Sequence, residues 1–432
     1  MFPREEYQLR MNKTKQKMLE YGVEVLILSN PSNLCYLTGY NAWSFYVHQV
    51  VLVLIDEEEP IWIGREMDAH SARTTTWLDQ RRIIPYPDEF VQSTIRHPMD
   101  FVANILTDLG QGQRKIGVEM DAFYYTAMCH ERITYGLPDA EFKNTSTIVN
   151  WVRVIKSDEE IRYMRKAAKI VENAMQSAYD TVNVGVREND VAAAIYHAQV
   201  SGTKEFGGDY TSIVPMLPTG KNTASPHLTW TDRKYVEGDF LTLEIAGCYQ
   251  RYHTPLARTM SLGKAPESVR EVGKVVTEGI SETLAQMKPG VTAEQVEEVW
   301  RTSIGKHGFI KASRLGYSIG LSYPPDWGEH TISFRKGDRS LLEPGMTFHL
   351  MPGIWFDDFG VEITESVLIT DSGSKHLRHL TVTCLKNRCS PFIKKRHSRI
   401  VPFFLFLEGQ DQILRDEMGG TLECVRCRGV VP

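Results

Sequence analysis

The pattern of apolar residues changes near residue 150, and this change constrains the fold more than any other feature of the sequence. Before it, short apolar runs at residues 25–29, 50–55, 60–64 and 115–119 alternate with polar stretches that favour helices. Alternation of short strands with helices is typical of an α/β domain, which we predict over residues 1–150. The helices expected in this domain lie at residues 4–21 and 122–135.

The second half opens on a long amphipathic helix. Ser157 and Glu160 form a capping box, and apolar residues then recur every three or four positions from Ile161 to Ala178. Further helices are expected at residues 188–201, 265–288 and 292–306, and strands at residues 211–217, 239–246, 258–262, 346–351 and 361–370. Helices grouped around long β segments predict an α+β domain with a curved antiparallel sheet over residues 151–375.

Composition argues against a nucleic-acid or membrane partner. The chain has 432 residues and a formal net charge of −5, and no apolar run approaches the roughly 18 residues that span a bilayer. The first residues are charged and lack the apolar stretch of a signal peptide. Seven cysteines, an odd number spread over a long chain, are not a disulfide framework. We therefore expect a cytoplasmic enzyme acting on a small or zwitterionic substrate.

Residues 376–432 differ from the rest of the chain. Residues 381–432 hold four of the seven cysteines and carry nine Lys or Arg against five acidic residues. A nucleic-acid or membrane tail and a metal site at Cys424 and Cys427 are the sharper interpretations, but a single Cys-x-x-Cys pair is weak evidence for zinc. We favour a poorly ordered appendage without function, as a shifted reading frame would produce.

Glu244 is the candidate catalytic carboxylate. It lies in the middle of a predicted strand, where a carboxylate is costly unless it is paired, hydrogen-bonded or protonated. A structural ion pair with Arg258 is the alternative, and the residues alone do not choose between the two. His227 lies in a hydroxyl-rich segment after Pro226. It becomes a stronger candidate for a second catalytic residue only if its side chain lies close to Glu244, because a histidine and a carboxylate can together serve as acid and base.

Several segments resemble the creatinase/aminopeptidase P superfamily. Residues 153–161 are similar to its linker-to-helix signature, and the resemblance continues, in order, over about residues 5–375. The matching segments are residues 30–33, 36–39, 227–259, 315–321, 343–353 and 361–370. This resemblance implies an α/β N-terminal creatinase-like domain followed by an α+β pita-bread C-terminal domain.

The chain departs from this superfamily at its metal ligands. The peptidases hold two metal ions with Asp, Asp, His, Glu and Glu, whereas the corresponding residues here are Glu244, Pro255, Tyr317, Met351 and Thr364. Pro, Met and Thr side chains do not replace carboxylate or imidazole ligands of divalent cations. Glu362 and Glu365 lie beside the last of these positions. We expect neither a metal nor another cofactor.

The resemblance therefore points to the metal-free, creatinase-like branch, which hydrolyses non-peptide C–N bonds with His and Glu. His227 lies where creatinase has its catalytic histidine, but Ala257 and Met351 stand at the creatinase glutamate positions, which argues against creatine. Residues 39–49, 64–70 and 96–100 are more closely similar to the ectoine hydrolases, which open a cyclic amidine.

This closer resemblance implies hydrolysis of ectoine, and of 5-hydroxyectoine, to N-acetyl-2,4-diaminobutyrate. Glu244 would act as nucleophile or as base for a water, and His227 would carry a proton to the departing ring nitrogen. The other residues expected to contact substrate are Tyr317, His349, Trp43, Phe45, Tyr46, Asp326, Trp327 and His330. For any one of the three N-terminal aromatic residues, a role in the core is more common than a role in binding, and His349 and the 326–330 loop also have ordinary structural interpretations.

The resemblance also implies partners. In this superfamily the N-terminal domain of one subunit tends to reach the active site of its partner, so we expect a homodimer, and a downstream deacetylase of the same pathway could act on the product. Two alternatives of other kinds are a creatinase-type or Xaa-Pro dipeptidase-like hydrolase and a non-catalytic binding protein on the same fold.

Overall fold

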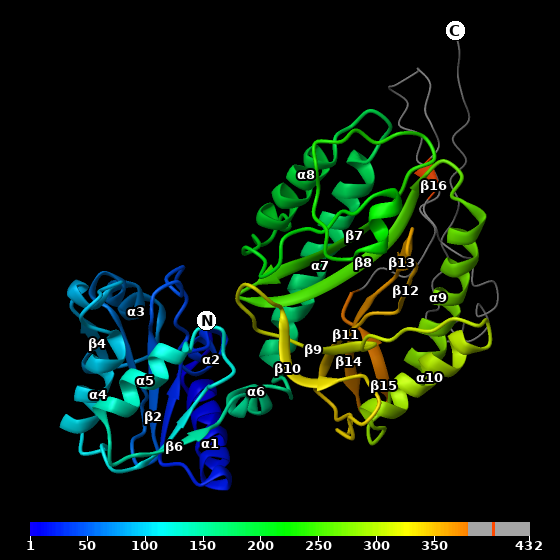
Figure 1. The fold of residues 1–432 in the computed structure, drawn as a ribbon. Helices are drawn as coiled ribbons and strands as arrows, with labels where there is room; N and C mark the ends of the chain where they lie inside the picture. Colours follow the sequence, from blue (N-terminus) through cyan, green and yellow to red (C-terminus); the bar gives the residue numbers. More distant parts are fainter. Residues whose placement is uncertain (379–399, 402–432) are drawn as a thin grey trace, which may run out of the picture.

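The computed structural model describes residues 1–378 and 400–401 and consists of two lobes (Figure 1). The N-terminal lobe and the larger C-terminal lobe are connected through the short helix α6, Ile148–Val152. The structure confirms the predicted classes of the two halves, α/β and then α+β. None of the helices in the described part of the chain is long and apolar enough to cross a membrane. The prediction for the tail falls almost wholly on residues outside the described ones.

A six-stranded mixed sheet forms the N-terminal lobe, in the order β4-β3-β2-β1-β5-β6. The central strand β1 pairs antiparallel with β2 and parallel with β5, and is buried throughout. The strands are β1 Val25–Leu28, β2 Val50–Leu54, β3 Ile61–Arg65, β4 Ile83–Tyr86, β5 Lys115–Val118 and β6 Glu141–Asn144. The helices are α1 Arg4–Tyr21, α2 Pro31–Thr38, α3 Ala69–Thr75, α4 Pro98–Asp108 and α5 Ala127–Gly136, with 3-10 turns η1 Glu66–Asp68, η2 Gln80–Arg82 and η3 Asp88–Phe90.

The predicted strands of this lobe are all present, but the helix expected over residues 122–135 begins only at Ala127. Thr126 is its N-cap, and its hydroxyl accepts the backbone N–H of Cys129 at 3.2 Å. The prediction missed α4, which begins after His97. There Nδ1 of His97 accepts the N–H of Met99, and Asp100 accepts the N–H of His97, a capping box without Ser or Thr.

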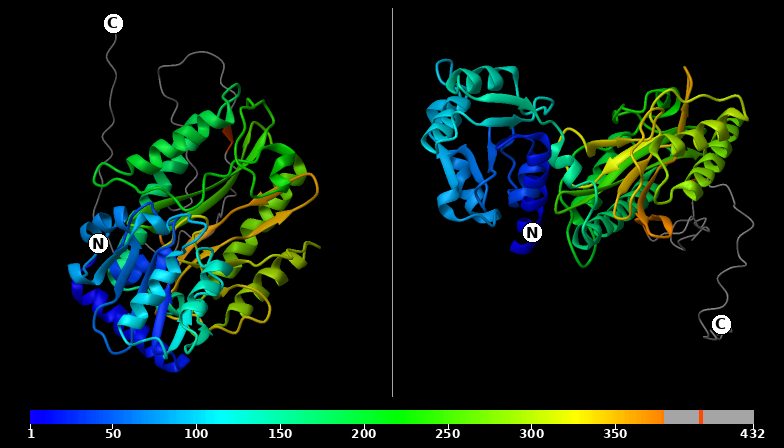
Figure 2. Two further views of the ribbon diagram at one scale, coloured as in Figure 1. Left: turned by 60° about the vertical axis from the view of Figure 1, so that its left-hand side comes forward. Right: turned by 90° about the horizontal axis from the view of Figure 1, so that it is seen from below.

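The C-terminal lobe combines an antiparallel sheet with a long hairpin (Figure 2). The sheet has the order β10-β9-β11-β14-β15, and the hairpin of β7 and β8 packs against the long helix α7. The strands are β7 Phe240–Tyr249, β8 Tyr252–Leu262, β9 Gly316–Ile319, β10 Gly328–Ser333, β11 Thr347–Leu350, β12 Gly353–Trp355, β13 Gly360–Glu362, β14 Glu365–Thr370, β15 Gly373–His376 and β16 Ile400–Val401. The helices are α7 Asp158–Thr181, α8 Glu188–Ser201, α9 Glu267–Gln286 and α10 Ala293–Gly305, with a 3-10 turn η4 Gly220–Ala224.

Helix α7 begins as the capping box predicts. Ser157 accepts the N–H of Glu160, and the Glu160 carboxylate accepts the N–H of Ser157 at 3.0 Å. The helix approaches β7 so closely that a Cβ at Gly247 would lie 2.0 Å from the carbonyl oxygen of Ala167. Glycine at this position lets the apolar face of the helix pack directly on the hairpin that carries Glu244.

Two predicted strands of this lobe differ in the structure. The strand expected at residues 211–217 is wrong: only Met216 forms a β-bridge there, and Ser212 instead binds the ring of His253 through its N–H and its hydroxyl. The strand expected over residues 361–370 breaks into β13 and β14 at Ile363 and Thr364. Before these two residues the chain pairs with β12, and after them it pairs with β11. Between the two pairings the Thr364 N–H donates to the carbonyl of Ala257.

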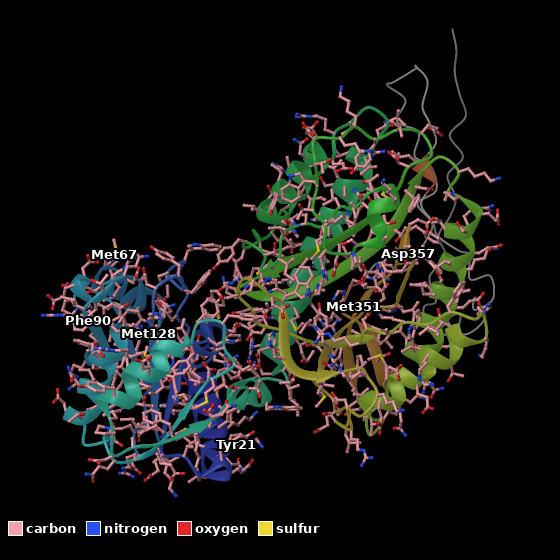
Figure 3. All side chains as sticks on the ribbon, in the orientation of Figure 1. Tyr21, Met67, Phe90, Met128, Met351 and Asp357 are labelled. Atoms are coloured by element: carbon pink, nitrogen blue, oxygen red, sulfur yellow. The ribbon has the colours of Figure 1, made fainter. Side chains whose placement is uncertain are left out.

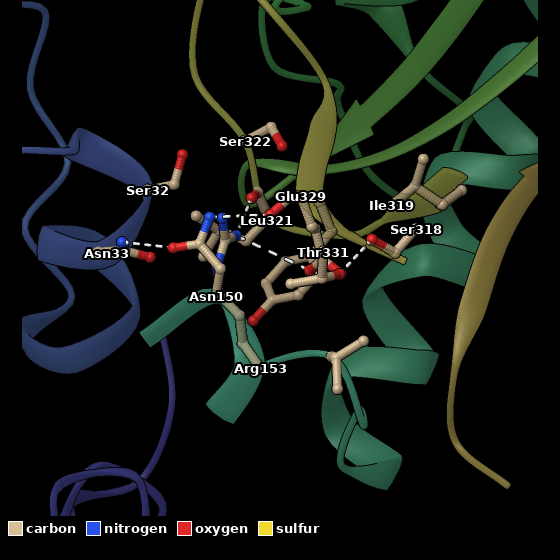
Figure 4. Close-up of polar contacts among 12 residues, drawn as sticks. Ser32, Asn33, Asn150, Arg153, Ser318, Ile319, Leu321, Ser322, Glu329 and Thr331 are labelled. Carbon is tan, nitrogen blue, oxygen red and sulfur yellow. Dashed lines mark hydrogen bonds and ion pairs between the residues drawn. The ribbon is translucent and has the colours of Figure 1, made fainter. Parts of the chain in front are cut away.

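Buried polar residues join the two lobes (Figure 4). The Asn33 amide donates to Glu119 at 2.5 Å and to Asn150 at 2.8 Å, and the Asn150 amide donates to the backbone carbonyl of Glu329 at 2.8 Å. The Glu329 carboxylate accepts from Lys156 at 2.5 Å. Because buried polar groups are costly when unpaired, this chain of contacts holds β10 and its neighbouring loop against the N-terminal lobe.

Candidate active site

Glu244 lies in the middle of β7 and is 5% exposed. Its backbone is held on both sides, by register with Ala257 of β8 and by two hydrogen bonds with Met216, both of 3.0 Å. Burial raises the pKa of the Glu244 carboxyl well above its ordinary value, and the neighbouring Glu362 raises it further, while Lys311 lowers it. The strand therefore presents a buried carboxyl in a fixed position, beside a second one.

The second carboxyl belongs to Glu362, the last residue of β13, which is 3% exposed. Its Oε2 is buried without a hydrogen-bond partner within the described part of the chain. Burial raises its pKa, and Lys311 opposes this shift. Glu244 and Glu362, here called the carboxylate pair, thus have one half-buried lysine as their compensating cation. Burial lowers the pKa of that lysine, whose Nζ lies 4.4 Å from the centre of the Trp355 ring.

A chain of hydrogen bonds runs beside the carboxylate pair. The Trp327 indole N–H donates to the Tyr317 hydroxyl at 2.7 Å, which lies 3.3 Å from Nδ1 of His349. Nε2 of His349 lies 2.8 Å from the hydroxyl of Thr364, which also accepts the Ala257 N–H at 2.7 Å. Burial lowers the pKa of His349 to about 3, so its ring is neutral and can donate from one nitrogen and accept at the other.

Cationic and acidic side chains lie at the edge of this chain. The Arg314 guanidinium stacks over the Tyr317 ring, with 4.2 Å between Cζ and the ring centre, and donates to Ser333 at 3.3 Å. Asp326 accepts from the ring of His330 at 2.7 Å and from the Gly328 N–H at 3.0 Å. Asp326 and His330 also line a small cavity between the lobes. The predicted residues Glu244, Tyr317, His349, Trp327, Asp326 and His330 are therefore gathered in one region.

Arg258 does not pair with Glu244. It binds Glu365 at 2.6 Å, together with Arg378 at 2.6 Å and His376 at 3.1 Å. Although burial by itself would raise the pKa of Glu365, the charges of Arg258 and Arg378 and the hydrogen bonds from His376 and Arg378 hold it well below its usual range. Glu365 therefore belongs to a structural ion cluster, and the alternative of an ion pair between Glu244 and Arg258 is wrong.

Among the N-terminal aromatic residues, Phe45 packs against the same apolar cluster that contains Tyr317, Trp327 and Tyr323. Phe45 packs edge-on against Tyr323, with ring centres 5.7 Å apart, and Trp43 packs against Tyr210 at 4.7 Å. Trp43 and Tyr46 are 59% and 62% exposed. None of the three has a ring contact with Tyr317 or His349 within the described chain. Their role in substrate binding stays a prediction.

His227 is exposed on the segment between η4 and β7. No hydrogen bond joins it to Glu244 among the described residues. The contact with Glu244 that would strengthen His227 as a candidate is therefore not observed in the described chain, and the catalytic role of His227 stays a prediction.

The donor set does not fit the dinuclear metal centre of the related peptidases. Pro255 lies on β8, and Met351 follows β11 (Figure 3). The hydroxyl of Thr364 is already hydrogen-bonded to the His349 ring and to the Ala257 N–H. Glu362 adds a second carboxylate to Glu244, but the charge beside them is the ammonium group of Lys311. Two carboxylates with a lysine, beside an imidazole of His349 whose Nε2 already bonds the Thr364 hydroxyl, are a poor set for two divalent ions.

The sequence prediction missed Glu362, Lys311 and Arg314 as members of this site. Glu362 stood beside a ligand position of the superfamily, a signal that could have identified it. Lys311 and Arg314 lie on the connection between α10 and β9, where nothing in the residue pattern indicates a contact with β7.

Comparison with known proteins agrees with this architecture. The family model of the Creatinase/Prolidase N-terminal domain matches residues 10–155, and that of Metallopeptidase family M24 matches residues 162–371. The solved prolidase of Pyrococcus horikoshii OT3 superposes with a TM-score of 0.73 at 22% identity, covering 86% of this chain and 99% of that one. This likeness concerns the fold.

Two curated relatives are closer in sequence. An ectoine hydrolase from Halomonas elongata is 46% identical over 383 residues, covering 87% of this chain and 96% of the relative. An uncharacterized hydrolase/peptidase from Sinorhizobium fredii is also 46% identical, over 372 residues that cover 86% of this chain and 95% of that protein. With these identities over nearly the whole length of both relatives, the chain belongs to the creatinase/aminopeptidase P family of hydrolases.

Proposed function

We propose that this hydrolase opens the cyclic amidine ring of ectoine, and of 5-hydroxyectoine, to N-acetyl-2,4-diaminobutyrate. The observation that carries the proposal is the carboxylate pair, two buried glutamates with one lysine as compensating cation and one oxygen without a partner in the described chain. The name of the Halomonas relative, which is aligned over 96% of its length, supports the substrate.

The charges of the site suit a zwitterion. Ectoine is a six-membered ring with an amidinium carbon between two nitrogens and a carboxylate on the ring. The carboxylate pair offers a counter-charge for the amidinium, and the unpartnered Oε2 of Glu362 offers an acceptor for one of its N–H groups. Arg314, stacked over the Tyr317 ring, is a suitable partner for the substrate carboxylate.

The reaction adds one water across one ring C–N bond. Glu244 acts at the amidinium carbon, either directly as nucleophile or by taking the proton of an attacking water. The bond between this carbon and one ring nitrogen breaks, and the nitrogen leaves as an amine after receiving a proton. The amidinium is already electrophilic, so we propose that this chemistry uses no metal and no other cofactor.

Two proton routes to the leaving nitrogen compete. His227 supplies the proton only if its exposed segment approaches Glu244, whereas the hydroxyl of Tyr317 already lies in a hydrogen-bonded chain with His349 and Thr364. Comparison of kcat in H227A and in Y317F separates them: loss in the first alone favours His227, and loss in the second alone favours the Tyr317 chain.

The decisive experiment incubates the purified full-length protein with ectoine in the presence of EDTA and follows ring opening by NMR. We expect N-acetyl-2,4-diaminobutyrate to form in the wild type and in E298Q, a control at an exposed glutamate, but not in E244Q. Activity retained in E244Q would exclude the proposed role of Glu244. Turnover of an Xaa-Pro dipeptide in place of ectoine would favour the peptidase alternative, and tight ectoine binding without product would favour a binding protein.

The remaining expectations concern assembly and context. We propose a homodimer, in which the exposed Trp43 and Tyr46 lie at the boundary between subunits, and sedimentation velocity tests it. Because the product carries an N-acetyl group, a deacetylase is the class of enzyme that would consume it. A cytoplasmic location stays a prediction.

A further inference from the structure

A second cluster of chemically reactive side chains lies in the N-terminal lobe, away from the carboxylate pair. His48 precedes β2, His97 caps α4 and Cys129 lies in the first turn of α5. One ligand atom from each of the three lies within 4.8 Å of the others. Phe90 and Met128, labelled in Figure 3, lie beside the cluster, since Phe90 lines the adjoining cavity and Met128 precedes Cys129.

The spacing of the cluster matches a shared metal ion. Sγ of Cys129 lies 3.5 Å from Nδ1 of His48, and the rings of His48 and His97 have centres 4.8 Å apart. In a tetrahedral zinc site, bonds of about 2.3 Å to sulfur and about 2.0 Å to nitrogen place these two ligand atoms roughly 3.5 Å apart. Cys129 and His48 thus already have this separation, and one ligand atom of His97 lies within 4.8 Å of both.

The surroundings provide room for a fourth ligand. His48 and His97 line a cavity of about 120 Å³, bounded also by Tyr46, Tyr86 and Arg96, which can admit a water. Cys129 is fully buried, and the Thr126 hydroxyl donates to its sulfur at 3.4 Å, an orientation that suits a thiolate. No carboxylate belongs to the cluster, so its chemistry favours Zn²⁺ over Mg²⁺ or Ca²⁺.

We propose that His48, His97 and Cys129 bind one Zn²⁺ ion, with a water from the cavity as fourth ligand. Binding forms one Zn–S and two Zn–N bonds, and the thiol proton of Cys129 passes to solvent.

A zinc ion at this site would restrain the conformation of the segment that carries the N-terminal aromatic residues. Residues 41–49, here called the aromatic loop, hold Trp43, Phe45 and Tyr46 and include His48 near their end. Zinc at His48 would attach this loop to α4 and α5. Its function is therefore structural, and it does not depend on the hydrolysis proposed above.

The test is Co²⁺ titration of the full-length chain, monitored by absorption spectroscopy. Cys384, Cys389, Cys424 and Cys427 are first replaced by Ser, so that the tail contributes no thiolate. We expect one equivalent of Co²⁺ to produce a thiolate-to-cobalt charge-transfer band and the intense visible bands of tetrahedral coordination, and stoichiometric Zn²⁺ to abolish both.

Variants assign the signal to these residues. C129S should lose the charge-transfer band, whereas C35S, at another buried cysteine, should keep it. H97N is the sharper variant, because asparagine is a strong N-cap and preserves the start of α4 while removing the imidazole. It should lower Co²⁺ affinity at least tenfold with an unchanged circular dichroism spectrum. Absence of the band in the parent protein, or a band that C129S or H97N leaves unchanged, would overturn the proposal.

Discussion

Two buried clusters of carboxylates in the C-terminal lobe differ in how their charge is compensated. Glu365 is surrounded by Arg258, Arg378 and His376, which hold its pKa below the usual range. Glu244 and Glu362 share one half-buried lysine, and burial raises the pKa of both. A carboxylate surrounded by several cationic partners stabilises the fold, whereas two carboxylates that share a single cation are prepared to receive a second one from a ligand.

The comparison predicts its largest effect at Glu244. Replacing it by Gln removes the nucleophile or base without changing the shape of the side chain, so kcat for ring opening should fall about 10³-fold or more. Steady-state kinetics measures this loss. The thermal midpoint should not fall, because the variant also removes a costly buried carboxyl. A fall in the midpoint together with retained activity would assign Glu244 to the structural class instead.

Glu365 should behave in the opposite way. E365Q leaves buried arginines without their counter-charge, and we expect the free energy of unfolding to drop by about 3–5 kcal/mol. Urea denaturation measures it. Since the folded-state pKa of Glu365 is depressed, its contribution is present above the unfolded pKa of about 4.3 and is lost as the pH falls below it. A variant that is as stable as the wild type at pH 7 would contradict the structural assignment.

Glu362 should affect binding more than the chemical step. E362Q removes the unpartnered acceptor for the amidinium, and we expect KM for ectoine to rise about tenfold, with a smaller change in kcat. A loss confined to kcat would show that Glu362 acts in catalysis. The E298Q control should change neither constant.

The smallest expected effect is a shift in the pH dependence of kcat/KM on substitution of Lys311, and it tests the electrostatics of the carboxylate pair specifically. Glutamates that must be ionised make kcat/KM rise with pH, and burial raises the pKa of Glu362 to about 7, against the opposing effect of Lys311. K311M removes the cation that lowers both carboxyl pKa values, so the acid limb should move to higher pH. A limb that stays in place would show that Lys311 does not face the carboxylate pair in solution.

The local features of the fold could be predicted from the sequence. The capping box at Ser157, the period of α7 and the strand that carries Glu244 are all present, because capping and apolar periodicity act over a few residues. The strand expected at residues 211–217 is absent because a contact with a distant residue overrides the local pattern. Its apolar composition is right, but the ring of His253, 41 residues away, takes the hydrogen bonds of Ser212.

The residues of the site also differ in whether local sequence was enough to identify them. Glu244 was identified as a carboxylate in the middle of a strand, Tyr317 as the residue at a ligand position of the superfamily, and His349 as a neighbour of the former metal site. His227 was assigned by spacing alone, and the structure leaves it exposed and without a hydrogen bond to Glu244 in the described chain. Spacing along the chain indicates which residues are available, and it does not indicate the direction in which a loop side chain points.

The sequence by itself determined the alternation of elements in the two halves and the strand that positions Glu244, because these depend on residue type and local period, whereas the loss of the metal ligands is implied by its resemblance to the creatinase/aminopeptidase P superfamily. Only the tertiary structure decided that Arg258 neutralises Glu365 while Lys311 is the cation beside Glu244 and Glu362. Electrostatic partners are set by distance and burial in three dimensions, and loops such as the one carrying Lys311 acquire both only when the strands from distant segments pair.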